Sequence, residues 1–175
     1  SIVVAAPAAG NEGGTSTVSD PGPAAYAGRT ADCVGVEVTV PAPADAADVA
    51  SLEDARAALG AVASSYVAVR IDNVAGSTAV VPPLVTVLNA AGAHAAYREA
   101  WIVLEEWIAA APPTADTAAA ADLATAIRDR STVPPGATAE LALVAAGVPS
   151  DVAEVRIGAG ATSSVLAPVA AASAP

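Results

Sequence analysis

The sequence predicts a mainly β protein, an antiparallel β-sandwich with helical insertions. Apolar and polar residues alternate within residues 34–40, 66–72 and 139–157, as expected for strands with one buried face. Turn residues, mostly Pro, Gly and Asn, separate these segments. Residues 49–60 and 97–130 instead show helical spacing of apolar residues. At 175 residues, the chain has the length of one ordinary domain with a real core.

Composition excludes some classes of partner. Eighteen acidic against seven basic residues give a net charge of -11, which disfavours binding to nucleic acid. No apolar run is long enough to cross a membrane without interruption by Pro or polar residues. The sequence leaves open whether the protein binds a small molecule.

The chain divides into three regions. Residues 1–31 are rich in Ala, Gly and Pro and lack a structural period, so we expect an extended or flexible N-terminal arm. Residues 32–160 contain the sandwich domain with its helical excursions, and residues 161–175 form an Ala- and Pro-rich tail. The start at Ser1, without Met, favours a mature exported protein over an excised fragment.

The first predicted strand is followed by a helix. In "CVGVEVTVPAP" one face carries Val34, Val36, Val38 and Val40. The prolines at 41 and 43 end this strand. The helix over 49–60 has Ser51 as a possible N-cap and Gly60 as its stop. Its apolar face comprises Val49, Leu52, Leu59 and Val62.

The next segment predicts two antiparallel strands joined by a turn. In "YVAVRID" the residues Val67, Val69 and Ile71 share the buried face. The residues "NVAGST" then turn the chain, and "AVVPPLVTVLNAAGAHAAY" supplies further strand.

Helical spacing returns in "AAYREAWIVLEEWIAAAPP". Tyr97, Trp101, Leu104 and Ile108 are 4, 3 and 4 residues apart, which would place them on one helical face. A strand is the competing interpretation, because alternate residues from Trp101 to Trp107 also form a pattern. Two prolines follow, and "DTAAAADLATAIRDRS" predicts a second helix.

The last third predicts two more strands. A Pro-Pro-Gly turn precedes a strand with Ala139, Leu141 and Leu143 on one side. After a second turn, Val152, Val155 and Ile157 are the expected core residues of the final strand.

About half of the chain resembles an immunoglobulin-like domain of undefined function found in exported lipoproteins and surface proteins of Gram-positive bacteria. The resembling segments are "YVAVRIDNVAGSTAVVPP", "VTVLNAAGAHAAY" and "STVPPGATAELALVAAGVPSDVAEVRI". The resemblance implies immunoglobulin-like topology and an extracytoplasmic, non-catalytic role. It supplies no functional residue, and the helical stretches would be insertions.

The residues that carry chemistry do not form a catalytic or metal-binding pattern. His94 is the only histidine and is expected in an exposed loop, because a metal site needs several convergent ligands. Cys33 is the only cysteine and is expected to be a small buried or interfacial thiol. Glu99, Glu105 and Glu106 are expected on a solvated face. We therefore predict that the protein is not an enzyme and uses no cofactor or metal.

Two groups of residues are candidates for binding a partner. Tyr97, Trp101 and Trp107 could form an aromatic surface for a protein or glycan, although packing of the helix on the sheet is the simpler explanation. Of the two tryptophans, Trp107 is expected to be the more exposed. Ile2, Val3 and Val4 could add a strand to a sheet edge, more readily in a neighbouring subunit or partner than in their own domain.

Two roles remain open at this point. The first is a non-catalytic structural or accessory subunit of a cell-surface or extracellular assembly, with protein partners or self-assembly. The alternative is an extracytoplasmic binding module that presents loops or the aromatic helix to a protein or glycan. Both roles place the protein outside the cell or in the cell envelope.

Overall fold

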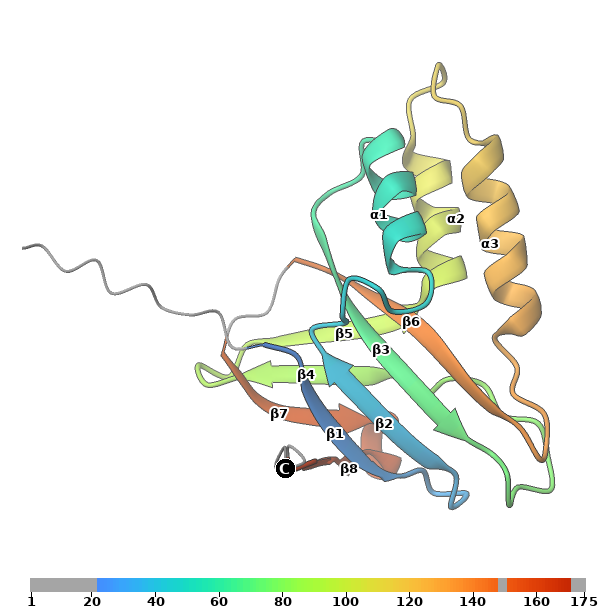
Figure 1. Ribbon diagram of the computed structural model, residues 1–175. Helices are drawn as coiled ribbons and strands as arrows, with labels where there is room; N and C mark the ends of the chain where they lie inside the picture. The colour runs from blue at the N-terminus through green and yellow to red at the C-terminus, as the bar shows by residue number, and fades with distance from the viewer. Residues whose placement is uncertain (1–21, 148–150, 171–175) are drawn as a thin grey trace, which may run out of the picture.

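The computed structural model describes residues 22–147 and 151–170, which fold into a β-sheet with three helices standing at one side (Figure 1). The strands are β1 (Ala24–Arg29), β2 (Gly35–Val40), β3 (Ser64–Asp72), β4 (Val85–Asn89), β5 (His94–Glu99), β6 (Thr138–Ala146), β7 (Val152–Ile157), β8 (Ser164–Val165) and β9 (Ala167–Pro168). The helices are α1 (Val49–Ala58), α2 (Ala100–Ala110) and α3 (Ala118–Arg130), with a single 3-10 turn at Gly160–Thr162. The predicted mainly β class with helical insertions is confirmed.

The nine strands form one antiparallel sheet in the order β8-β7-β4-β5-β6-β3-β2-β1-β9. Strand β5 joins the two halves of the sheet. The first part of β5 pairs with β4, and its last residues, Arg98 and Glu99, pair with β6. The short strands β8 and β9 follow one another in the chain yet pair with opposite ends of the sheet, β7 and β1. The sheet is therefore nearly closed. This single sheet does not confirm the immunoglobulin-like sandwich, which has two separate sheets.

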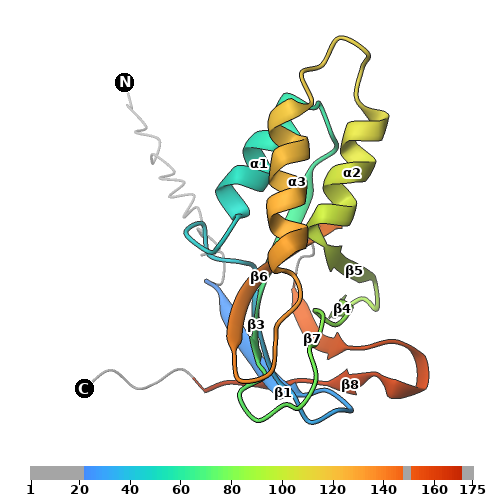
Figure 2. The same cartoon turned by 90° about the vertical axis from the view of Figure 1, so that its right-hand side faces the viewer.

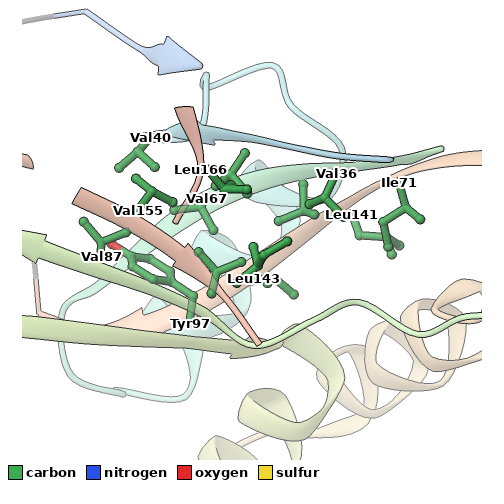
Figure 3. Packing of buried hydrophobic residues seen from close by; sticks show 14 of the residues in the cluster. Val36, Val40, Val67, Ile71, Val87, Tyr97, Leu141, Leu143, Val155 and Leu166 are labelled. Carbon is green, nitrogen blue, oxygen red and sulfur yellow. The ribbon is translucent and has the colours of Figure 1, made fainter. Parts of the chain in front are cut away.

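A core of mostly aliphatic side chains, with Tyr97 among them, fills the interior of the curved sheet (Figure 3). The alternating valines of β2 and β3 point inward, as the sequence predicted, and Val38, Val67 and Val69 are fully buried. Leu166 lies between β8 and β9 and is also buried. A Cβ atom at Gly28 would lie 2.6 Å from Leu166 Cδ2, so the glycine in β1 makes room for this leucine.

The three helices stand at one side of the sheet (Figure 2). A second apolar cluster joins them to the outer face of the sheet. Strand β6 contributes Ala142 and Val144, and α2 contributes Val103, Leu104 and Trp107. Because Leu141 and Leu143 of the same strand point into the interior, β6 is buried on both faces. Strand β6 therefore belongs to both hydrophobic clusters.

The predicted helices are present, with shifted boundaries. Helix α1 begins after Asp48, which has a left-handed φ of 68°, so Ser51 is inside the helix and is not its N-cap. Gly60, with a φ of 65°, follows the helix as predicted. Residues 101–107 are helical, which excludes the alternative strand. Helix α2 nevertheless begins only at Ala100, because Tyr97 belongs to β5.

Three expectations about the strands need correction. The strands that flank the "NVAGST" turn do not pair, since β3 lies between β2 and β6. Residues Ala24–Arg29 of the predicted arm form β1, and the predicted tail contains β8 and β9. These segments show little apolar alternation, and they become strands because the ends of the sheet offer unpaired backbone groups.

The segment from β8 to β9, which contains Leu166, gives a test of the fold. Substitution L166A should lower the free energy of unfolding by about 2 to 5 kcal/mol, as for other buried leucines. V169A removes a side chain that is 45% exposed and should cost much less. Urea denaturation monitored by tryptophan fluorescence measures both, and equal losses for the two variants would contradict the role given to Leu166.

Candidate functional site

A cleft of about 500 Å³ lies between α2 and the outer face of the sheet, and we call it the α2 cleft. Its lining residues come from the approach to β3 and from β5, α2 and the end of β6. They are Val62, Ser64, His94, Ala95, Ala96, Arg98, Val103, Glu106, Trp107, Ala110, Val144, Ala145 and Ala146.

Strand alternation in β5 supplies one wall of the α2 cleft. Tyr97 points into the interior of the sheet, so its neighbours Ala96 and Arg98 point outward beneath α2. Ala96, together with Ala146 at the end of β6, leaves space that larger side chains would fill. The cleft therefore exists because alanines meet the last turns of α2.

An ion pair crosses from sheet to helix at this site. The Arg98 guanidinium donates two hydrogen bonds to the Glu106 carboxylate, at 2.7 and 2.6 Å. The two side chains are 45% and 54% exposed, so the pair is in contact with solvent. The hydrogen bond from Arg98 lowers the pKa of Glu106, and the same bond raises the pKa of Arg98. Such a solvated pair contributes little to stability, but its polar groups are available to a ligand.

The apolar part of the cleft comes from α2 and from the loop before β3. Trp107 is 8% exposed, and its remaining surface lies at the cleft. Val62 is 69% exposed, so its side chain offers apolar surface at the cleft. The cleft thus combines an apolar lining with the charged pair and the exposed His94.

Among the three aromatic candidates, only Trp107 lines the α2 cleft. Tyr97 is 1% exposed in the interior core, where its hydroxyl forms a 2.8 Å hydrogen bond with Ser65. Trp101 is half-buried, and its indole nitrogen donates to Glu99 at 2.7 Å. The Arg128 guanidinium lies 5.7 Å from the centroid of the Trp101 ring.

The predicted aromatic face on α2 is therefore wrong. The helix buries Ala100, Val103, Leu104 and Trp107, so Trp107 is the more buried tryptophan and not the more exposed one. Helix α2 begins only at Ala100, which leaves Tyr97 in the sheet, and the packing of α2 against β6, α1 and α3 sets which of its side chains are buried. Ile2, Val3 and Val4, the other predicted partner-binding residues, lie outside the described residues.

The chemically reactive side chains do not meet in one place. His94 is exposed as predicted, at the start of β5. Cys33 is exposed in the turn between β1 and β2, so the prediction of a buried thiol is wrong. An interfacial role for Cys33 remains a prediction. Cys33 adopts the left-handed backbone conformation in this turn, with a φ of 62°. His94 and Cys33 line different hollows, and within residues 22–147 and 151–170 no group of acidic, His and Cys side chains could hold a metal ion.

Sequence reasoning did not find the α2 cleft. Arg98 and Glu106 are eight residues apart, and this spacing predicts no contact within a single helix or strand. The two side chains meet because β5 ends and α2 begins between them. The one local signal was the alternation of His94, Ala96 and Arg98 with Ala95 and Tyr97 in β5. The strand segment predicted from the sequence already ended at Tyr97, and extending its alternation by one residue would have placed Arg98 on the opposite face.

No family model, characterised protein or solved structure matches the chain. In the described part of the chain, none of the helices has the length and apolar character needed to cross a membrane. The function must therefore be argued from the site itself.

The buried Tyr97 predicts how stability depends on alkaline pH. Burial raises the pKa of Tyr97, and the hydrogen bond with Ser65 lowers it by less. In the unfolded chain the phenol loses its proton near pH 10, while the folded protein still holds it. The free energy of unfolding should therefore fall as the pH rises above about 10.

Substitution Y97F tests whether ionisation of Tyr97 causes the loss of stability at alkaline pH. It should cost about 1 to 3 kcal/mol at neutral pH, because Ser65 loses its partner, and it should weaken the alkaline decline. S65A removes the same hydrogen bond but keeps the phenol, so its alkaline decline should remain. Urea midpoints between pH 8 and pH 11 measure both, and parallel pH curves for wild type and Y97F would contradict the assignment.

Proposed function

We propose that this protein is a non-catalytic binding module whose α2 cleft takes a short apolar segment of a partner polypeptide. The observation that carries the proposal is the cleft itself, in which Trp107 and Val62 border a floor of alanines. Aromatic and aliphatic anchors in a pocket contribute most of the affinity at protein interfaces. Arg98, Glu106 and His94 supply hydrogen-bonding groups at its margin.

A peptide suits the site better than a glycan. Sugar recognition commonly uses the open face of an aromatic ring, and Trp107 is 8% exposed. The other tryptophan, Trp101, is half-buried and has the Arg128 guanidinium over its ring. A small apolar side chain of a partner needs only the space above Ala96 and Ala146, together with backbone hydrogen bonds at the margin.

The proposal includes the absence of catalysis. An acid, base or nucleophile would need a partner held within hydrogen-bond reach. In the α2 cleft, Glu106 is held by Arg98, and His94 is exposed at the margin. Both arrangements support recognition of a polar group more readily than proton transfer at a reacting atom.

The proposed location is extracellular or in the cell envelope, and it rests on the sequence resemblance to exported immunoglobulin-like domains. Immunoglobulin-like topology remains a proposal on the same basis. A role as a subunit of a surface assembly would need a second contact surface, which Ile2, Val3 and Val4 were predicted to supply. That role remains a prediction, and the α2 cleft favours the binding module.

Filling the cleft tests the proposed function. Ala96 lies in the cleft and is exposed, so A96W should block the site while leaving both cores unchanged. Ala153 is exposed on β7, outside the cleft, and A153W is the matched control. Phage-displayed random peptides should be selected on the wild-type protein, and the affinities of enriched peptides should then be measured by calorimetry on all three proteins.

We expect the selected peptides to contain apolar residues and to bind A96W at least about tenfold more weakly than wild type, the loss typical of a disrupted anchor pocket. Binding to A153W should be unchanged. Failure to enrich any peptide, or equal affinity for A96W and wild type, would refute the proposal. Circular dichroism confirms that both variants are folded.

A further inference from the structure

A second apolar groove, separate from the α2 cleft, lies between α1 and α3. It has a volume of about 420 Å³, and we call it the α1–α3 groove. It is lined by Ser51, Asp54, Ala55, Ala58, Leu59, Asp116, Ala119, Ala120 and Leu123. Helices α1 and α3 stand together with α2 at one side of the sheet in both ribbon views (Figures 1 and 2).

Helices α1 and α3 run antiparallel, with the start of α1 beside the end of α3. Arg130, the last residue of α3, forms an ion pair with Asp48, the residue before α1. Both helices also bury side chains against α2, among them Leu52 and Ile127. The groove between them stays open because the facing residues Ala55, Ala58 and Ala119 are too small to fill it.

The charges at the groove are all of one sign. Asp54 and Asp116 line it, and no basic residue does. The nearby arginines are already engaged: Arg56 binds Glu53 and the Ala61 carbonyl, and Arg128 binds Glu105 on the side of α2. A cationic partner would therefore find carboxylates without competing guanidinium groups.

The same charges argue against other occupants. A second copy of the chain would bring the same two carboxylates to the same groove, and each copy carries a net charge of -11. An anionic lipid surface would be repelled for the same reason. A groove between two antiparallel helices has the shape in which the apolar face of a third helix packs.

We propose that the α1–α3 groove binds an amphipathic helix of a partner protein, with apolar side chains over Leu59 and Leu123 and flanking lysines or arginines near Asp54 and Asp116. This inference goes beyond the proposed function, because it concerns a different face of the helices. The two sites share no lining residue.

A synthetic peptide tests the inference. The probe is a helical peptide of leucine and lysine, arranged so that a leucine stripe is flanked by lysines. A leucine and glutamate peptide of the same pattern and a scrambled leucine and lysine peptide are the controls. Titration of the full chain, followed by backbone amide shifts in NMR, locates the bound peptide and measures its affinity.

Two pairs of variants separate the groove from diffuse charge attraction. A119W fills the groove, and A121W places the same exposed side chain on α3 outside the lining. D54N/D116N removes both carboxylates while the Asn at 116 still accepts the hydrogen bond from the Ala118 amide. D32N/E140Q removes two charges from exposed residues that do not line the groove.

We expect amide shifts clustered on α1 and α3, at least about tenfold weaker binding to A119W, and about fivefold weaker binding to D54N/D116N. A121W and D32N/E140Q should bind nearly as wild type does. The inference is overturned if the leucine and lysine peptide does not bind, if its shifts lie in the α2 cleft or elsewhere, or if D32N/E140Q weakens binding as much as D54N/D116N. Concentration-dependent dimerisation through the groove would also overturn it, because the occupant would then be a second copy.

Discussion

The pairing of β3 with β6 is the interaction on which the rest of the structure depends. The two strands are in register over nine residue pairs, from Ser64 with Ala146 to Asp72 with Thr138. Their inward side chains, such as Val67 and Leu143, belong to the interior core, and outward residues of β6 belong to the helical cluster. One ladder thus joins the two hydrophobic clusters, and a register slip by one residue would exchange their faces.

Alanine determines where this protein is hollow. Small side chains let helices approach a sheet or one another closely, yet they cannot fill the space that remains beside a helix end. The α2 cleft has a floor of Ala96 and Ala146, and the α1–α3 groove has Ala58 and Ala119. The interior core is different, because leucine, isoleucine and valine predominate there. The surface sites therefore follow from the same composition that makes the chain look apolar.

Electrostatics separates the two proposed sites. Five of the seven basic side chains form ion pairs, all of them arginines, and the chain still carries a net charge of -11. In the α2 cleft the Arg98 and Glu106 charges compensate each other, so an uncharged apolar segment suits that site. At the α1–α3 groove Asp54 and Asp116 have no basic residue beside them in the lining, so a cationic helix suits that one.

Local periodicity allowed much of the secondary structure to be predicted from sequence. Alternating valines identified β2 and β3, and helical spacing identified α1 and α3, because these patterns depend only on neighbours along the chain. The sequence by itself therefore determined the mainly β class, the helical insertions and the acidic surface. Only the tertiary structure decided that β3 pairs with β6, that Leu166 closes the sheet, and that Trp107, Arg98 and Glu106 border one cleft. Each of these depends on contacts between residues whose relative positions are set by packing and backbone pairing, which no local pattern in the sequence encodes.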